Sequence, residues 1–147
     1  MPFHRFYCSP NLYTTEEKHA IAQAVTKFYS FLPPFLVIVN FIDVDQDNFY
    51  VSGEPNDKYL RINVMQSANP VPDRAWVESW EKAIEPFTKG KGIDYGLQMS
   101  NEDPLLWSVN GLSVPPFLSE DYMTWKKLNK PVAWKHSADE TGPKADQ

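Results

Sequence analysis

The sequence contains one cysteine, Cys8, and no block of basic residues. A single cysteine excludes an internal disulfide. The 14 basic residues are outnumbered by 19 acidic ones, for a formal charge of −5, so the electrostatic footprint of a nucleic-acid or anionic-membrane binder is absent. No apolar run reaches the ~20 residues of a membrane span, and the first residues lack the pattern of a signal peptide. We therefore expect a soluble, cytoplasmic protein.

Signatures of metal and cofactor binding are missing as well. The sequence has no glycine-rich phosphate loop and no nucleophile elbow. The histidines His4, His19 and His136 have no acidic or cysteine partners at ligand spacing. We therefore expect no metal and no cofactor, and Cys8 is expected to be a buried, small apolar side chain.

Apolar residues are plentiful. Hydrophobic residues make up 42% and aromatic residues 14% of the 147-residue chain, which is enough to pack the core of one domain. We expect this domain to span residues 2–135. The remaining residues, 136–147, are polar and are predicted to form a disordered tail.

The first half of the chain has the pattern of a strand, a helix and a strand. Residues 2–8 are short, aromatic-rich and bounded by turn residues, which indicates a strand. Thr14 and Glu17 have the spacing of a capping box, and the helix that they begin is expected to end near Tyr29 or Phe31. Residues 35–42 form an apolar run, which predicts a strand covered on both faces.

The second half repeats this order. The patterns predict a strand, a helix and a strand at residues 58–65, 73–87 and 93–99, with a hairpin arm at 48–52 and a last short helix at 119–130. Two consecutive βαβ units predict an α/β (α+β) fold, in which a four-stranded sheet carries two helices on one face. The exposed edges of such a sheet favour assembly into a homotrimer.

Pro2 is the main candidate for a catalytic group. Because the residue after Met1 is small, Met1 is expected to be removed, which leaves the secondary amine of Pro2 at the start of a strand. Burial or nearby cations lower the pKa of such an amine. A neutral amine is a general base and a protonated one is a general acid.

The chain resembles the tautomerase superfamily, in particular its long-chain branch that contains cis-3-chloroacrylic acid dehalogenase and related fungal proteins. The resemblance is carried by Pro2 and by the segments YCS, KHAIAQAVT, VNF and NGLSVPP, at residues 7–9, 18–26, 39–41 and 110–116. It implies a trimer of double βαβ subunits, each with a pocket around its amino-terminal proline.

The resemblance also places other candidate residues. A histidine that ends the first helix in the dehalogenase branch corresponds to Tyr29. Of two arginines that follow the third strand in that branch, one corresponds to Gln66 and the other to Asn69 or Arg74. A tyrosine of the pocket corresponds to Tyr95.

Two departures from this branch bear on the reaction. The glutamate that activates water there corresponds to a position near Val109, and Gln66 in place of an arginine removes a charge-assisted partner of a carboxylate. Hydrolytic dehalogenation is therefore disfavoured. Arg61 competes with Arg74 as the cation of the site, although its place in the middle of a strand favours a surface or subunit ion pair for Arg61.

We therefore expect a tautomerase or isomerase that acts on a small carbonyl or enol compound, with Pro2 as acid and base. Tyr29, Gln66 or Tyr95 would polarise the carbonyl group. One alternative is a lyase, hydratase or decarboxylase that acts on a small unsaturated acid in a specialised pathway. A second alternative is a catalytically inert trimer that binds a ligand.

Overall fold

The computed structural model describes residues 1–67 and 70–135. The predicted tail, residues 136–147, and Asn69 lie outside the described residues. The main sheet contains β1 (Pro2–Cys8), β2 (Ile38–Asp43), β5 (Leu60–Ser67) and β6 (Tyr95–Glu102), and the helices are α1 (Thr15–Phe28), α2 (Arg74–Ile84) and α3 (Glu120–Leu128). A hairpin, β3 (Tyr50–Val51) and β4 (Glu54–Pro55), and short 3-10 helices at Pro34–Leu36, Gln46–Asn48, Glu85–Phe87, Lys89–Lys91 and Pro104–Leu106 complete the chain.

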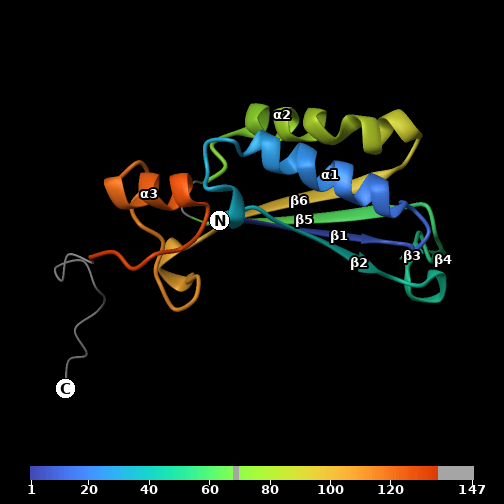
Figure 1. Cartoon of the computed structure of the whole chain (residues 1–147). Helices are drawn as coiled ribbons and strands as arrows, with labels where there is room; N and C mark the ends of the chain where they lie inside the picture. Colours follow the sequence, from blue (N-terminus) through green and yellow to red (C-terminus); the bar gives the residue numbers. More distant parts are fainter. Residues whose placement is uncertain (68–69, 136–147) are drawn as a thin grey trace, which may run out of the picture.

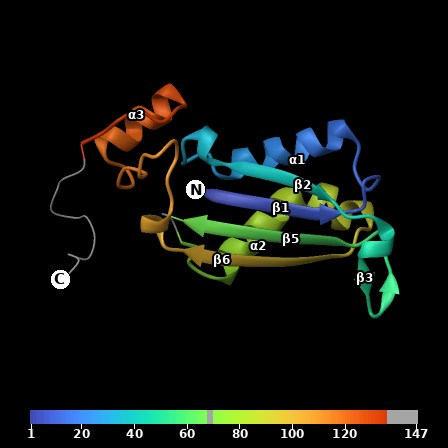
Figure 2. The ribbon, with the colours of Figure 1, turned by 90° about the horizontal axis from the view of Figure 1, so that it is seen from below.

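The strand order confirms the predicted pair of βαβ units. The sheet runs β2-β1-β5-β6, with β1 parallel to β2 and β5 parallel to β6. The two units meet through the antiparallel pairing of β1 with β5. Helices α1 and α2 lie on one face of the sheet (Figure 1), and the view from below shows the opposite face of the strands without a helix over it (Figure 2).

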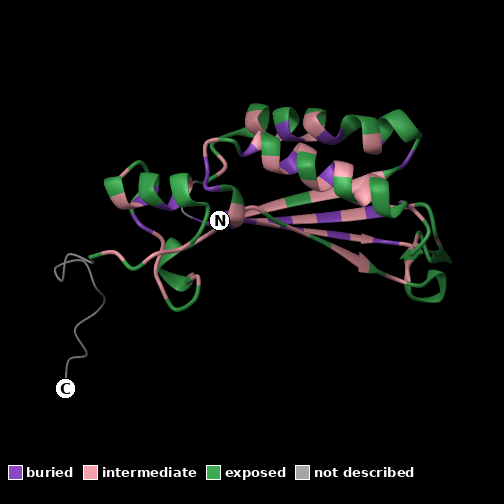
Figure 3. Ribbon diagram, viewed as in Figure 1, coloured by how far each residue is buried: buried purple, intermediate pink, exposed green. Residues whose placement is uncertain are grey.

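The core lies between the sheet and these two helices. Along β1 and β5, buried and half-buried residues alternate (Figure 3), because successive side chains of a strand point to opposite faces. Phe6, Ile62 and Trp80 are at most 1% exposed in this core, and Cys8 is fully buried, as expected.

Helix α1 determines where Tyr29 lies. The capping box is present: Glu17 N donates to the Thr14 hydroxyl oxygen at 3.1 Å, and Thr14 N donates to the Glu17 carboxylate at 2.9 Å. From this fixed start, Ile21 and Val25 face the core at helical spacing. Tyr29 continues the same stripe just past the helix end and is 1% exposed.

The prediction for residues 35–42 was wrong in two respects. Pro33 and Pro34 lack the backbone N–H that a ladder needs, and the chain first forms a 3-10 helix, so β2 begins at Ile38. The strand also lies at the edge of the sheet, with Ile38 36% exposed. Similarly, the predicted helix at 73–87 ends as an α-helix at Ile84 and continues as a 3-10 turn that contains Pro86.

The segment after β6 forms a second cluster. The short helix predicted at 119–130 is confirmed as α3, with the Ser119 hydroxyl oxygen as its cap. This segment lies beside the end of the sheet where the chain begins (Figures 1 and 2). There Trp125 packs with Leu36 and Met1 in a cluster apart from the main core. No helix among the described residues is long and apolar enough to cross a bilayer.

Candidate active site

Pro2 begins β1 and is buried. In the antiparallel ladder it lies opposite Gln66. The ladder continues one residue further, because Ser67 N and the Ser67 hydroxyl donate to the Met1 carbonyl oxygen at 3.3 and 3.2 Å. The Pro2 nitrogen therefore lies inside the end of the sheet, covered by Met1.

The amine of Met1 shows what this position does to a basic nitrogen. It donates to the Ser67 carbonyl oxygen at 2.6 Å and to the Ser67 hydroxyl oxygen at 3.0 Å. Burial lowers its pKa from 8.0 to about 5, because desolvation penalises the charged form. The Met1 amine is therefore neutral near pH 7.

Tyr29 and Gln66 meet beside Pro2. The Gln66 side-chain amide donates to the Tyr29 hydroxyl oxygen at 2.5 Å. Burial raises the pKa of Tyr29 well above its ordinary value, so the phenol keeps its proton. Within the described residues, no acceptor is recorded for that proton. The pair therefore forms a buried, oriented O–H donor.

His4 lies on the same face of β1 as Pro2. It is fully buried, with its ring stacked on Trp80 (5.7 Å between centroids) and edge-on to Tyr29 (5.4 Å). Its Nδ1 lies 3.0 Å from the Ile38 carbonyl oxygen, so Nδ1 carries the proton and Nε2 is bare. Nε2 has no hydrogen-bond partner among the described residues. His4 is therefore a packed, hydrogen-bonded residue of the strand.

The burial of His4 makes the stability of the protein depend on pH. Desolvation lowers the pKa of His4 to about 4, below its ordinary value of 6.5, so the unfolded chain binds the proton more tightly. Stability is then full above pH 6.5 and falls as the pH drops towards 4. We expect His4 to contribute a loss of about 2 kcal/mol between pH 7 and pH 5, measured by urea unfolding, in addition to any contribution of the buried terminal amine. The loss in His4→Phe should be smaller by about 2 kcal/mol; an equal loss in the variant would contradict the assignment.

Arg74 and Tyr95 are brought together, but not with Pro2. Arg74 is exposed and pairs with Glu78 at 3.2 Å and Glu81 at 3.1 Å. Tyr95 donates to the other oxygen of Glu81 at 2.9 Å, and burial together with this carboxylate raises the pKa of Tyr95 to about 12. These residues line a surface depression of about 330 Å³ over α2.

The register places Tyr95 at the far end of the sheet. Tyr95 lies opposite Leu60, whereas Pro2 lies opposite Gln66. Six residues along β5 separate these positions, which is about 20 Å. Within one chain, Tyr95 therefore lies away from Pro2. Arg74 begins α2 at the Pro2 end of the sheet, but its side chain is held by Glu78 and Glu81, and its role at Pro2 stays a prediction.

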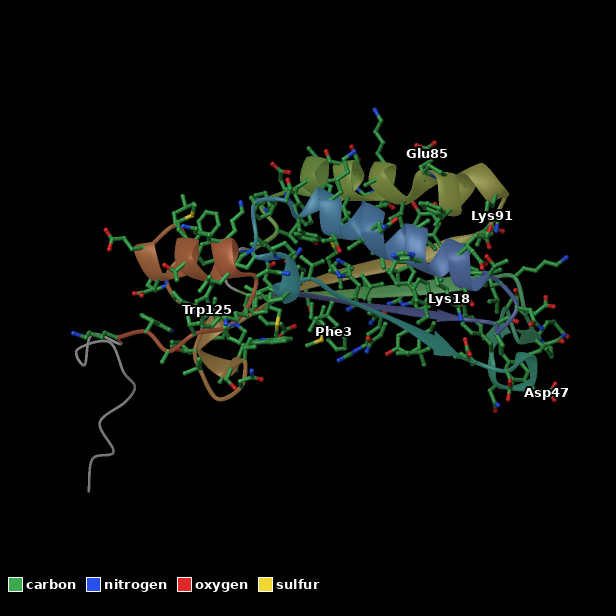
Figure 4. All side chains as sticks on the ribbon, viewed as in Figure 1. Phe3, Lys18, Asp47, Glu85, Lys91 and Trp125 are labelled. Atoms are coloured by element: carbon green, nitrogen blue, oxygen red, sulfur yellow. The ribbon has the colours of Figure 1, made fainter. Side chains whose placement is uncertain are left out.

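The other arginines lie on the open face of the sheet. Arg61 donates to Asn63 at 3.0 Å and to Gln98 at 2.6 Å. The guanidinium of Arg5 lies over the ring of Phe3, 4.6 Å from its centroid, and Phe3 projects from the face opposite the helices (Figure 4). Pro2 faces the helices, so Arg5 and Arg61 lie on the other face of the sheet from it.

Two polar residues near Pro2 were missed in the sequence. Ser67 holds the Met1 backbone, and Glu102 lies opposite Ser67 in the pairing of β5 with β6. A Glu102 carboxylate oxygen accepts from the Ser100 hydroxyl at 2.6 Å. The predicted strands stopped at residues 65 and 99, so neither residue was assigned to the sheet. If the two predicted strands had been extended to Ser67 and Glu102, the parallel pairing would have placed these two residues side by side.

Comparison with known proteins places this arrangement in a family. Residues 1–130 match the family Tautomerase_3, described as "Putative oxalocrotonate tautomerase enzyme". No protein of curated function matches the sequence.

Several solved structures share the fold. Native RhCC from Rhodococcus jostii RHA1 is 28% identical with a TM-score of 0.83, over 90% of this chain and 99% of that one. A "probable enzyme" from the thermophilic fungus Aspergillus fumigatus is 30% identical with a TM-score of 0.82, over 91% and 98%. N1, a member of the cis-3-chloroacrylic acid dehalogenase family, is 13% identical with a TM-score of 0.68, over 86% and 96%. A fused 4-OT described as an asymmetric trimer is 12% identical with a TM-score of 0.62, over 76% and 94%. On the match over residues 1–130, this chain belongs to the Tautomerase_3 family of the tautomerase superfamily.

Proposed function

We propose that the protein is a tautomerase that acts on a small carbonyl or enol compound, with Pro2 as its general acid and base after removal of Met1. The observation that carries this proposal is the buried start of β1, where Pro2 lies opposite Gln66 and the Gln66 amide holds the Tyr29 hydroxyl. Burial at this place lowers the pKa of the Met1 amine to about 5, and we expect it to lower that of a free Pro2 nitrogen as well. A neutral Pro2 nitrogen at pH 7 is able to accept a proton from carbon.

The reaction needs one proton and no other reactant. The lone pair of the Pro2 nitrogen takes a proton from the carbon next to the carbonyl group. The electron pair of that C–H bond becomes the C=C bond of an enolate, and the carbonyl π pair moves to oxygen. The protonated Pro2 then gives its proton to the enolate oxygen, which completes the enol. In the reverse direction, neutral Pro2 takes the proton from the enol hydroxyl group and delivers it to carbon.

Tyr29 is suited to stabilise the oxygen on which this charge develops. Its hydroxyl group accepts from Gln66 and keeps its own proton for donation. A preorganised donor in a buried site stabilises a developing oxyanion strongly. Because Arg74 is paired with Glu78 and Glu81 and the other two arginines lie on the opposite face of the sheet, a substrate with little negative charge fits this site better than a diacid.

We also propose that the protein works as a homotrimer, as the fused 4-OT relative does. The sheet face opposite the helices is open, and Leu105 and Leu106 are 80% and 83% exposed. Assembly would cover such apolar surface.

The dependence of activity on pH tests the state of Pro2. Deuterium exchange from solvent into 2-butanone and 2-oxobutanoate, followed by proton NMR, measures proton transfer at carbon. We expect kcat/KM to be constant from neutral to mildly alkaline pH and to fall on the acid side, with an apparent pKa below about 7. If activity appeared only at a pH low enough to protonate Pro2, the role of Pro2 as a general base would be contradicted. If deuterium exchange were no faster than in buffer alone, the tautomerase function would be rejected.

Hydration of an unsaturated acid is the second candidate, and Glu102 is the observation that favours it. Glu102 is two strands away from Pro2, at the same end of the sheet, and a carboxylate is able to activate water. This reaction needs a protonated Pro2 as acid. The hydratase would be established if the protein consumed a 3-substituted acrylic acid, if Glu102→Gln lost this activity, and if no deuterium exchanged into ketones. Binding without any turnover would indicate the inert trimer instead.

A further inference from the structure

The side chain of Met1 fills an apolar slot that begins at the Pro2 nitrogen. Met1 is 8% exposed, and it packs with Leu36 (1%) and Trp125 (fully buried). Partly buried side chains complete the wall, among them Phe35, Trp107, Val114 and Trp134. Figure 4 shows Trp125 on the segment that lies beside the start of β1. We refer to the space within these residues as the Met1 slot.

Two of the indole N–H groups of the wall are engaged outside the slot. The Trp125 indole N–H donates to the Val132 carbonyl oxygen at 2.8 Å, and the Trp134 indole N–H donates to the Ser113 carbonyl oxygen at 2.8 Å. The two indoles therefore present carbon to the slot.

The walls are also tied to each other. The Phe35 backbone N–H donates to the side-chain oxygen of Asn129 at 2.9 Å. The Lys126 ammonium donates to the Phe31 carbonyl oxygen at 3.3 Å. These bonds join the loop before β2 to the end of α3. The slot is therefore bounded by two segments that hold each other in place, and the ammonium of Lys126 is committed to a backbone carbonyl.

The position of the slot relative to Pro2 follows from covalent structure. The Met1 carbonyl carbon is bonded to the Pro2 nitrogen, so a molecule that takes the place of Met1 has its reacting carbon next to that nitrogen. A bond of ~1.33 Å becomes a contact of ~3–3.5 Å, a displacement of about 2 Å. The remainder of the molecule then extends between Leu36 and Trp125.

We propose that the Met1 slot binds the tail of the substrate, and that the substrate is a neutral enolisable ketone or aldehyde with an unbranched apolar chain. The proposal rests on the tautomerase function proposed above. A methionine side chain is unbranched, with three rotatable bonds, so a linear tail of similar length fits the same walls. A carboxylate at the end of the tail would be buried without a partner, which is costly.

A series of methyl ketones tests the tail. In 2-heptanone, carbon 3 reacts and four further atoms match the methionine side chain. With the processed protein, verified by intact mass, kcat/KM for deuterium exchange at carbon 3 should rise about fourfold per methylene, or about 60-fold from 2-butanone to 2-heptanone. It should fall again at 2-nonanone, which is too long. A rate that does not depend on chain length would overturn the proposal.

Two ketones of similar shape, one of them charged, test whether the preferred substrate is neutral. 4-Oxopentanoate and 5-methyl-2-hexanone have nearly the same shape, and only the first carries a carboxylate. We expect the ketone to react about 100-fold faster, since the described residues that wall the Met1 slot carry no charge and a buried carboxylate without a partner is costly. Equal or faster reaction of the acid would contradict a neutral substrate.

Two leucine variants separate the slot from general packing. Leu36→Ala lengthens the slot and should move the best substrate from 2-heptanone towards 2-nonanone. Leu32→Ala is the matched control: Leu32 is also buried, in the same loop, but it packs in the main core. It should lower stability without moving the preference; the same shift in both variants would overturn the assignment.

The outcomes distinguish this proposal from the function on which it rests. If 2-butanone exchanges only when Pro2 is free, and kcat/KM does not rise with the length of the ketone, the tautomerase function is retained and the binding of a substrate tail in the Met1 slot is rejected. Absence of exchange into every ketone and 2-keto acid rejects the tautomerase itself.

Discussion

A protein that retains Met1 is expected to show no turnover above the buffer rate. In this form the Pro2 nitrogen is part of an amide, so it has no basic lone pair and carries no proton. General acid–base catalysis contributes about 10²–10⁴-fold, and all of it should be lost. Production with the methionine aminopeptidase inhibited gives this form, and intact mass with the exchange assay checks the result.

The fold provides the control for this comparison. Met1 is buried between Leu36 and Trp125, so the retained residue should leave the midpoint of thermal unfolding unchanged or raised. Pro2→Ala, which still allows removal of Met1, keeps a primary amine and should retain a small part of the activity. Full turnover by the form that retains Met1 would show that Pro2 does not perform the chemistry.

Tyr29→Phe is expected to lower kcat by about 10²–10³-fold, the range for losing one donor to a developing oxyanion. The change removes only the hydroxyl oxygen that accepts from Gln66, and the ring remains packed against His4 and Trp76. Steady-state kinetics should place the loss in kcat, because the donor acts mainly in the transition state.

Tyr13→Phe is the matched control for that variant. Tyr13 is also buried, and its hydroxyl donates to the Phe87 carbonyl oxygen at 2.8 Å. Its loss should cost about 1 kcal/mol of stability with kcat unchanged. Equal losses of kcat in both variants would assign the effect of Tyr29 to packing, and an unchanged kcat in Tyr29→Phe would remove it from the mechanism.

Local signals in the sequence predicted most of the fold. The capping box at Thr14 and Glu17 and the alternation along β5 depend on residues a few positions apart, and both are present in the structure. The strand ends were missed because they depend on distant partners. β5 continues to Ser67 since its antiparallel partner continues to Met1, and no pattern within residues 58–67 records that.

The candidate site was predictable only in part for a similar reason. The resemblance named Pro2, Tyr29 and Gln66, which the structure brings together, and their roles stay predictions. It also named Arg74 and Tyr95, whose side chains are held by Glu81. The contact of Trp125 with Met1 joins the two ends of the domain, so no spacing in the sequence could have indicated it.

The antiparallel contact of the two βαβ units gives the sheet an approximate twofold axis between β1 and β5. Rotation about this axis carries the start of β1 onto the start of β5, at the opposite end of the sheet. The start of β5 lies in mid-chain, so its backbone nitrogen is always an amide. Duplicating the unit therefore doubles the scaffold without doubling the reactive centres: each polypeptide offers one, and an assembly has as many as it has chains.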